Sequence, residues 1–551
     1  MIRVSANDYT RRGARRASTL RSKAADMIVW RAQQFIISMT VTEPNESDRS
    51  ARSSSLDISD QEMRDLSAQF VTLAQTYFAG VAQMPVFTQK SGDEIKARFD
   101  APPPIDGEPL EQLLTECQAM IDGSRHNGHP RFFGYVASPS TPAGAFADLL
   151  ASAVNPSVTS WRSAPAATQI EKTVVRWLGS MTGYDDDAHG TLTSGGSMAN
   201  LTALLIAQRV KSGANVSQQG LWNAGAPMTV YASDQIHLSI PKAADILGLG
   251  KQQVRLVPSD DRFRLDVSEL VKAIEKDRQD GLRPFCVIAS AGTAATGAID
   301  PLREIASIAR YYDLWFHIDG AYGAPAAMVS DQRENFSGLE LADSLSLDPH
   351  KWLYTPVDCG CLLLHDPAAA RKAFVTEADY IKVHEEGETE SFAFWDHGIE
   401  LSRRFRALKV WLTIKYYGAR RIAAAIRDDI AMAQYLAERV EAAPEFELLA
   451  PVELSICCFR YVPVRYRSRA DDATDTEQQA TINAELNQLN ERIMHAVQRG
   501  GNAYLSNAML HGKFGLRACI INFRTSRKDI DITLEVVQEA AREIDRKDDS
   551  R

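Results

Sequence analysis

The chain has 551 residues, of which 45% are hydrophobic, and its formal net charge is −10 at pH 7. This length leaves room for one large domain and one or two smaller ones with substantial cores. The acidic balance argues against nucleic acid as a partner, because no basic face is indicated overall. The sequence contains no run of about 18 apolar residues, so no membrane-spanning helix is expected.

The seven cysteines are scattered, without the spacing of a disulfide framework or of a paired metal site. Cys359-Gly360-Cys361 is too tight for the usual zinc spacing and lies in an apolar, strand-like run. We therefore expect no metal site. A reducing cytoplasm is the simplest location for a protein with this cysteine usage.

Residues 1–58 differ in composition from the rest of the chain. Met1 to Lys23 contain many arginines and one acidic residue, which superficially resembles a mitochondrial presequence. The favoured interpretation is a disordered tail, or a start assigned too early, with Met27 or Met39 as the true beginning. Beyond this tail we expect a helical arm and pocket segment at 59–150, a large domain at 151–420 and a small domain at 421–551.

Apolar residues recur at helical spacing over 60–78 and 108–121, which predicts two helices separated by proline-rich turns. Further along, the stretch SGGSMAN at 194–200 opens a long apolar-periodic helix. Glycines such as Gly196 let a ligand approach the free N–H groups of a helix start, and Ser197 adds a hydroxyl. This pattern is typical of a phosphate cradle, although a glycine-rich helix start is a weak signal by itself.

The stretch WFHID at 315–319 predicts a buried strand that ends in a carboxylate, Asp319. Open α/β sheets place ligands at this end of their strands. About thirty residues later, SLSLDPHKW at 344–352 places Lys351 between an imidazole and an indole. Burial there is expected to lower the pKa of the amine, which would become a nucleophile for an aldehyde cofactor. The alternative is a lysine that merely extends out of an apolar segment.

Strand-like segments alternate with helical ones near Val230, Val254, Cys286, Phe316, Ser344 and Cys361. This alternation predicts a mainly parallel sheet covered by helices. After residue 421 we expect helices at 422–443, 482–499 and 530–544, strands near Phe446 and Cys457 and at 515–522, and a loop at 468–479. These elements predict a small α/β domain.

The two motifs HIDGAY at 317–322 and DPHKW at 348–352 together resemble the group II pyridoxal-phosphate decarboxylases, which act on aromatic amino acids, glutamate or diaminobutyrate. The resemblance runs from about Gln61 to Ile544. It implies an α/β fold of PLP fold type I, like that of aspartate aminotransferase, with a mainly parallel central sheet. It also implies pyridoxal 5′-phosphate as the cofactor and a homodimer whose active site both subunits complete.

The resemblance also implies roles for individual residues. The catalytic residues would be Lys351, His237, His350 and the loop tyrosine Tyr380. The residues expected to bind the cofactor are Lys351, Asp319, Ala321, His237, Gly196, Ser197, Ser344, His350, Thr293 and Ser402. In this family the histidine that matches His237 stacks on the cofactor, and Ser402 would reach the phosphate of the neighbouring subunit.

The expected reaction is decarboxylation of an aromatic L-amino acid, namely Trp, Tyr, Phe or DOPA, to an amine and carbon dioxide. Asn127, Val136, Ser157 and Thr159 stand where aromatic-specific relatives carry bulkier groups, so glutamate, aspartate or 2,4-diaminobutyrate is the alternative. Tyr380 disfavours an aldehyde synthase, because it would protonate the substrate carbon. The HKW motif disfavours an aminotransferase. The intact lysine, carboxylate, histidine and tyrosine disfavour a catalytically dead binding protein.

Overall fold

The computed structural model describes residues 56–213, 216–375, 389–472 and 475–549. The chain divides into two compact units, Met1–Val71 and Thr72–Arg551. Helix α2 (Asp60–Gly80) begins in the first unit and ends in the second. The helices and strands that follow belong to the second unit. The domain boundaries expected after residues 58, 150 and 420 stay predictions.

The helices expected at 60–78 and 108–121 are confirmed as α2 and α4 (Leu110–Asp122). The turns expected between them contain an additional helix, α3 (Gly92–Phe99). A capping box starts this helix: the Ser91 hydroxyl accepts from the Glu94 N–H, and the Glu94 carboxylate accepts from the Ser91 N–H. The Ser-x-x-Glu spacing is a sequence signal for such a start.

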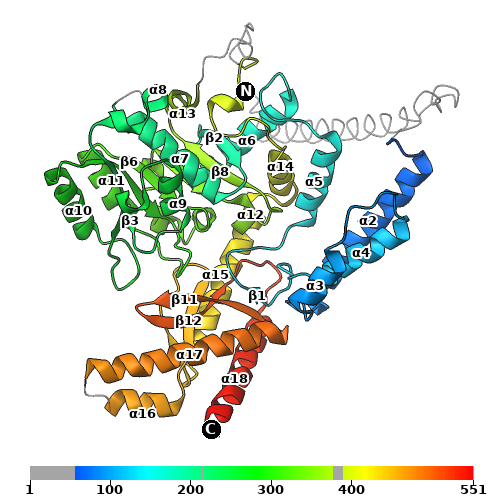
Figure 1. Ribbon diagram of the computed structural model, residues 1–551, viewed down its shortest axis with the longest axis vertical. Coiled ribbons are helices and arrows are strands. Elements are labelled where there is room, and N and C mark those ends of the chain that lie inside the picture. The colour runs from blue at the N-terminus through cyan, green and yellow to red at the C-terminus, as the bar shows by residue number, and fades with distance from the viewer. Residues whose placement is uncertain (1–55, 214–215, 376–388, 473–474, 550–551) are drawn as a thin grey trace, which may run out of the picture. The chain divides into compact units, whose positions relative to one another are not determined.

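A seven-stranded sheet forms the centre of the second unit (Figure 1). Five neighbouring strands are parallel, and β8 runs antiparallel to both of its neighbours. The strand order is β2 (His189–Thr193), β8 (Gly360–Leu364), β7 (Ser344–Leu347), β6 (Trp315–Asp319), β5 (Arg283–Ser290), β3 (Met228–Ser233) and β4 (Val254–Val257). The expected mainly parallel sheet is thereby confirmed.

Helices cover both faces of this sheet, and β5 shows how the two cores are separated. Val287 and Ala289 belong to one apolar cluster, while Cys286 and Ile288 belong to the other, because successive side chains point to opposite faces. The helices of this region are α5 (Pro142–Val154), α6 (Pro165–Thr182), α7 (Gly196–Lys211), α8 (Val216–Gln219), α9 (Ser239–Ile246), α10 (Val267–Gln279), α11 (Leu302–Tyr311), α12 (Pro349–Trp352), α13 (Pro367–Phe374) and α14 (Ala407–Tyr417).

A second sheet has five strands, and β1 joins it from far upstream in the sequence by pairing in parallel with β11. Its order is β1 (Phe132–Phe133), β11 (Tyr504–Leu510), β12 (Lys513–Cys519), β10 (Ile456–Tyr461) and β9 (Phe446–Leu448). The helices α15 (Ala419–Glu441), α16 (Val464–Asp472), α17 (Thr476–Gly500) and α18 (Arg527–Asp549) accompany it (Figure 1).

Two expectations for this part of the chain need correction. The loop expected at 468–479 is wrong, because α16 extends to Asp472 and α17 begins at Thr476. Both helices are strongly polar, because their exposed faces carry charged residues. A polar stretch of this kind resembles a loop in sequence. Strand β11 was not expected, because its residue types do not follow its burial pattern: Ser506 is buried, whereas Met509 is exposed.

Among the described residues, no helix combines the length and the apolar character needed to cross a membrane. The same residues contain no group of three or more His, Cys, Asp or Glu side chains placed to hold a metal ion.

A buried ion pair between Glu171 and Arg403 joins α6 to the segment before α14. The Arg403 guanidinium also donates to the Thr191 hydroxyl at 2.8 Å and to the Leu192 carbonyl at 2.9 Å. Its carbon lies 4.0 Å from the centre of the Phe394 ring. This one side chain therefore ties α6 and the edge strand β2 to the chain that enters α14.

We expect Glu171→Ala to lower the free energy of unfolding by about 3–5 kcal/mol, because it leaves a buried guanidinium without its counter-charge. Denaturant unfolding followed by circular dichroism measures this change. The control is Glu269→Ala, which breaks an exposed pair with Lys272 and should cost less than about 1 kcal/mol. Equal effects of the two substitutions would contradict this assignment.

Candidate active site

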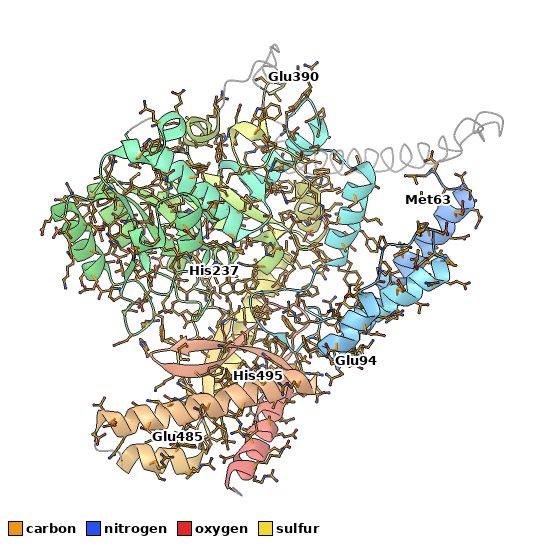
Figure 2. All side chains as sticks on the ribbon, in the orientation of Figure 1. Met63, Glu94, His237, Glu390, Glu485 and His495 are labelled. Carbon is orange, nitrogen blue, oxygen red and sulfur yellow. The ribbon has the colours of Figure 1, made fainter. Side chains whose placement is uncertain are left out.

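A cavity lies where strands of the seven-stranded sheet end and where β11 of the other sheet approaches them. Its volume is about 780 Å³. His237, which follows β3, lies on the side of the seven-stranded layer that faces the five-stranded sheet (Figure 2). Ligands bind at this edge of open α/β sheets, because the loops after parallel strands converge there.

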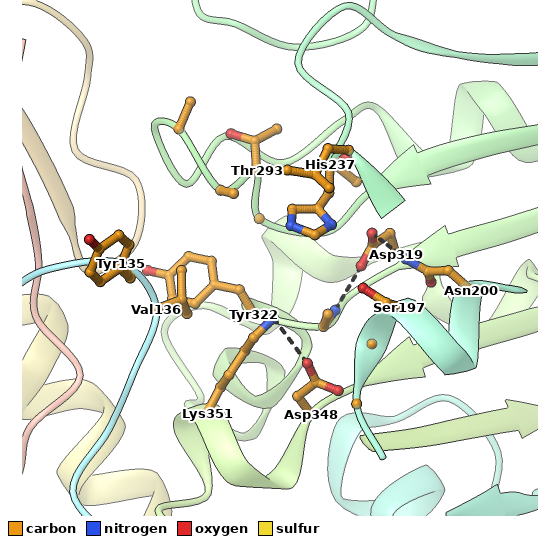
Figure 3. A pocket seen from close by; sticks show the side chains of 18 of the residues that line it. Tyr135, Val136, Ser197, Asn200, His237, Thr293, Asp319, Tyr322, Asp348 and Lys351 are labelled. Atoms are coloured by element: carbon orange, nitrogen blue, oxygen red, sulfur yellow. Dashed lines mark hydrogen bonds and ion pairs between the residues drawn. The ribbon is translucent and has the colours of Figure 1, made fainter. Parts of the chain in front are cut away.

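Lys351 enters the cavity from α12, the single helical turn that follows β7. Its Nζ lies 3.0 Å from Asp348 Oδ2 (Figure 3), and its side chain is 20% exposed. Burial opposes the charged ammonium, but the carboxylates of Asp348 and Asp319 outweigh burial and raise the pKa of Lys351. The expected lowering of this pKa is therefore wrong for the ligand-free chain, because the sequence did not show that Asp348 turns back toward the amine.

Asp319 ends β6 and lies at the inner end of the cavity. Its Oδ2 accepts a 2.8 Å hydrogen bond from Asn200 Nδ2, and its Oδ1 accepts a 3.1 Å bond from the Ala321 N–H (Figure 3). These donors hold the carboxylate in one orientation. Ala321, Lys351 and Asp319 line the same space, as the sequence predicted for parts of one site.

His237 borders the cavity on the other side from the Lys351 backbone (Figure 3). Burial lowers the pKa of this imidazole, so the ring is neutral at neutral pH. The Ser239 N–H lies 3.3 Å from Nδ1, and the Ser239 hydroxyl lies 2.8 Å from the same atom. Because a backbone N–H only donates, Nδ1 is an acceptor, and the ring proton is on Nε2.

A chain of buried hydrogen bonds supports Asp319 and His237 from below. Trp315 Nε1 donates to the Ser344 hydroxyl at 2.9 Å, and that hydroxyl lies 2.8 Å from His317 Nδ1. His317 Nε2 lies 3.1 Å from Asn200 Oδ1. Asn200 then donates to Asp319 and, at 3.0 Å, to the hydroxyl of Ser239. Burial lowers the pKa of His317 to about 4, so this ring is a neutral link in the chain.

The start of α7 forms another wall of the cavity, through Gly195, Gly196 and Ser197. No side chain caps this helix start, so its N–H groups are available to an anion. A Cβ added at Gly196 would lie 3.0 Å from both Ala321 Cβ and Asp348 Oδ2. Glycine therefore keeps this corner of the cavity open.

The structure brings most of the predicted site residues to this cavity: Lys351, Asp319, Ala321, His237, Gly196, Ser197, His350 and Thr293 line it. His350 Nδ1 lies 2.7 Å from the Cys359 carbonyl oxygen and 3.3 Å from the Cys359 backbone nitrogen, so the backbone of Cys359 fixes the orientation of this imidazole. The Thr293 hydroxyl lies 3.0 Å from that of Thr296 and accepts from the Ala298 N–H at 3.2 Å. It therefore also closes the turn after β5.

Three other predicted residues do not line the described cavity. Ser344 is buried in the hydrogen-bond chain beneath it. Ser402 is exposed to solvent elsewhere on the chain. Tyr380 lies outside the described residues.

Of the positions expected to shape the substrate pocket, Val136 lines the cavity. Asn127 borders a separate, smaller cavity of about 210 Å³. Ser157 and Thr159 do not line either of these cavities within the described residues.

Arg517 of β12 is a lining residue for which the sequence suggested no chemistry. It is 4% exposed, and its Nη1 donates to the Tyr135 carbonyl at 2.8 Å and to the Ser506 hydroxyl at 3.1 Å. Its Nε donates to the Ala295 carbonyl at 3.2 Å, whereas Nη2 has no hydrogen-bond partner among the described residues. A buried guanidinium with a spare donor is suited to an anionic ligand. The sequence feature that could have identified Arg517 is its position as an arginine within an apolar strand.

Comparison with known proteins agrees with this geometry. Residues 93–462 match the family model described as the pyridoxal-dependent decarboxylase conserved domain. An aromatic-L-amino-acid decarboxylase of Bacillus atrophaeus is 38% identical over 497 residues, which are 89% of this chain and 98% of that protein. A phenylacetaldehyde synthase of Petunia hybrida is 30% identical over 489 residues, 87% of this chain and 94% of that one.

Solved structures show the same relationship. The crystal structure of Oryza sativa TDC with PLP and tryptamine has a TM-score of 0.81 and 27% sequence identity, and the match covers 89% of this chain and 100% of that one. The lysine, the carboxylate and the glycine-rich helix start that converge on one cavity are the groups that the resemblance implied. From its sequence, its fold and this match, the chain belongs to the pyridoxal-dependent decarboxylase family.

Proposed function

We propose that this pyridoxal-phosphate-dependent carboxy-lyase converts an aromatic L-amino acid, such as Trp, Tyr, Phe or DOPA, to its amine and carbon dioxide. The observation that carries the proposal is the placement of Lys351 and Asp319 in one cavity whose remaining walls are largely apolar. The aromatic-L-amino-acid decarboxylase of Bacillus atrophaeus, at 38% identity, supports this choice of substrate class.

The residues of the cavity fit the cofactor. The uncapped start of α7 suits a phosphate, and the space that a Gly196 Cβ would fill lets the phosphate approach. Asp348 Oδ1 is buried without a hydrogen-bond partner among the described residues, so it fits a site for a polar ligand. When bound, the cofactor would supply a protonated pyridine ring that accepts the electron pair of the bond between the substrate's Cα and its carboxylate.

In this proposal each residue has one task. Lys351 would bind the aldehyde carbon of the cofactor. Asp319 would accept a hydrogen bond from the ring N–H and so keep the ring nitrogen protonated. His237 presents a flat neutral imidazole to the ring, with its proton on Nε2. The cofactor contacts that the resemblance implies for Gly196, Ser197, Ala321, Thr293, Ser344 and His350 complete the set.

The resemblance further suggests a homodimer, in which Ser402 serves the site of the neighbouring subunit. The cysteine usage suggests a cytoplasmic location. Tyr380 is proposed from the sequence as the donor that protonates Cα after carbon dioxide has left. This task matters because a carbon left unprotonated can react with oxygen instead.

Arg517 is the proposed site for the substrate carboxylate. Its spare Nη2 donor is buried, and it lines the cavity together with Lys351 and Tyr135. A charge-assisted bond to a carboxylate would satisfy this donor and orient the substrate. The backbone carbonyls that Arg517 also contacts hold the guanidinium plane in place.

The charges of the cavity favour an aromatic side chain over an acidic or diamino one. Among the described lining residues, the side chains with fixed positive charge are Lys351 and Arg517, and both have tasks in the reaction. The carboxylates are Asp319, which Asn200 holds, and Asp348, which pairs with Lys351. An additional charge on the substrate would therefore lack a counter-charge. The apolar walls come from Tyr135, Val136, Leu238, Tyr322 and Met509.

Two alternatives remain open to experiment. Decarboxylation of glutamate, aspartate or 2,4-diaminobutyrate is motivated by the small or polar residues at Val136, Asn127, Ser157 and Thr159. Conversion to an aldehyde, with oxygen as co-reactant, is motivated by the phenylacetaldehyde synthase of Petunia hybrida, at 30% identity.

We expect the cofactor-loaded enzyme to form tyramine, tryptamine or phenethylamine from a mixture of all common amino acids plus DOPA and diaminobutyrate. Lys351→Ala should form none, because it lacks the amine that binds the cofactor. Mass spectrometry of amines and aldehydes, with a peroxide assay, provides the measurement. Formation of GABA, β-alanine or a diamine would contradict the proposed substrate class. Formation of an aldehyde together with peroxide would contradict the proposed role of Tyr380.

Arg517→Gln should raise KM for the aromatic substrate by about tenfold or more, because a buried charge-assisted bond worth at least about 1.4 kcal/mol is lost. Steady-state kinetics with the loaded enzyme measures the change. Arg460→Gln is the matched control, since Arg460 is an equally buried arginine that pairs with Glu447 on the same sheet. An unchanged KM in Arg517→Gln would show that the carboxylate binds elsewhere.

Gly196→Ala should weaken cofactor binding by about tenfold, because overpacking costs about 1–3 kcal/mol where the new Cβ meets Ala321 and Asp348. Equilibrium dialysis with pyridoxal phosphate measures the affinity. Gly500→Ala is the control, since a Cβ at Gly500 would meet no atom within 4 Å. Equal affinities of the two variants would argue against a phosphate site at the start of α7.

A further inference from the structure

A buried carboxyl group lies directly behind the lysine turn. Asp429 of α15 accepts hydrogen bonds at its Oδ2 from Trp352 Nε1, at 2.9 Å, and from the Tyr354 hydroxyl, at 2.7 Å. Its Oδ1 accepts from the Asn522 N–H at 3.2 Å. Asp429 and Tyr354 are 2% and 3% exposed, and Trp352 is fully buried. This cluster therefore joins three segments that are far apart in the sequence.

The position of this cluster gives it influence over the active site. Trp352 is the residue after Lys351 and ends α12, which has only four residues. A single helical turn has little stability of its own, so tertiary contacts must fix its orientation. Figure 1 shows α15 extending from beside α12 toward the five-stranded sheet.

A second contact transmits the position of Trp352 to the cavity wall. Its indole stacks on the Tyr322 ring, with centroids 5.0 Å apart and planes 10° apart. Tyr322 lines the cavity, and its hydroxyl lies 2.6 Å from that of Ser455. A change in the orientation of Trp352 would therefore displace both the base of Lys351 and this wall.

We propose that Asp429 is a positioning residue for the decarboxylation: it holds Trp352 and Tyr354, and through them it directs Lys351 into the cavity. This inference rests on the proposed task of Lys351. Asp429 does not line the described cavity, so it acts through its hydrogen-bonded neighbours.

The charge state of Asp429 makes the proposal testable. Burial raises its pKa to about 7, although the bonds from Tyr354, Trp352 and Asn522 oppose the rise; the neighbouring Asp428 adds to it. Cys519 of β12 also faces the carboxyl group, and burial raises the pKa of that thiol to about 11. The ionised form of Asp429 accepts all three hydrogen bonds. Protonation occupies one acceptor position and weakens the hold on Trp352.

This titration has opposite effects on activity and on stability. Activity should fall as pH drops through about 7, because the carboxylate loses acceptor capacity. The pKa of Asp429 is raised in the folded chain from an ordinary value of 3.8, so the folded state binds a proton that the unfolded state has already lost. The stability contribution of this group is therefore present at low pH and is lost as pH rises toward 7.

The experiment measures kcat and KM of the cofactor-loaded enzyme between about pH 5.5 and 8.5 for the wild type and for Asp429→Asn and Asp428→Asn. We expect an inflection of kcat near pH 7 in the wild type, because Asp429 titrates there. Asp429→Asn should lose the inflection and about tenfold in kcat, because a small displacement of Lys351 slows the reaction, with KM changed by less than about twofold. Asp428→Asn is the matched control, since Asp428 is the exposed neighbour on the same helix. The inflection of kcat in this variant should move only slightly, to lower pH.

A second variant and a second readout separate positioning from simple loss of structure. Tyr354→Phe keeps the carboxyl group but removes one donor, so the inflection should move to higher pH. The pH at which the visible absorbance of the loaded enzyme changes should move with it. The rate at which the apo-protein takes up pyridoxal phosphate should fall in Asp429→Asn.

The proposal is overturned if Asp429→Asn keeps the wild-type pH profile, or if kcat falls by one factor at every pH with the inflection intact. If Asp429→Asn does not fold, an unchanged profile in Tyr354→Phe overturns it. Lys351→Ala distinguishes the two proposals: a cofactor absorbance band that persists unchanged in that variant would sink the task of Lys351, whatever the Asp429 variants show.

Discussion

The register between β6 and β7 is the constraint on which the site depends. Asp319 pairs with Ser346 across these parallel strands, so the carboxylate that ends β6 is level with the last turn before Lys351. Because both strands are buried and hydrogen-bonded on both sides, neither can slide without breaking the ladder of its other neighbour. The distance between the carboxylate and the lysine turn is thus set by the sheet and not by flexible loops.

Beneath this edge of the sheet, buried polar side chains form a chain of hydrogen bonds. The donors and acceptors from Trp315 through His317 to Asn200 have a consistent order, in which Asn200 directs its amide hydrogens at Asp319 and Ser239. A buried network of this kind specifies one arrangement, since reversing any member leaves an unpaired group at high energetic cost. Asn200 of α7, which lies outside the motifs of both residues, therefore orients Asp319 directly and His237 through the Ser239 hydroxyl.

The five-stranded sheet and the chain that follows it supply residues that complete the surroundings of Lys351. Arg517 and the β11 residues close the cavity on the side opposite the strand ends, and Asn522 reaches Asp429 behind the lysine turn. Contacts of this kind couple the position of the five-stranded sheet to the geometry around Lys351. They also explain why the ammonium group of Lys351 is held by Asp348 in an enclosed space and not by solvent.

Much of the fold and the centre of the site followed from the sequence by itself. The strand at 315–319 begins with apolar residues and ends in Asp319, and Leu345 and Leu347 alternate with serines in the strand at 344–347. The glycines at 195 and 196 precede a long periodic helix, so local pattern determines these elements. The spacing of Asp319, Lys351 and the glycine-rich start then identified the cofactor through a known family. α3, β11 and α16 were missed because their exposed faces hide the apolar period on which such reading relies.

Only the tertiary structure decided which groups face one another. The pKa of Lys351 is raised and not lowered, because Asp348 of the same helical turn lies 3.0 Å from the amine and the sheet adds the charge of Asp319 from another strand. The buried position of Ser344 and the spare donor of Arg517 arise in the same way, from contacts between residues separated by 27 or more positions. Local sequence determines secondary structure through propensity and period. Charge, burial and hydrogen bonding at a site depend on partners that the folded chain alone brings together.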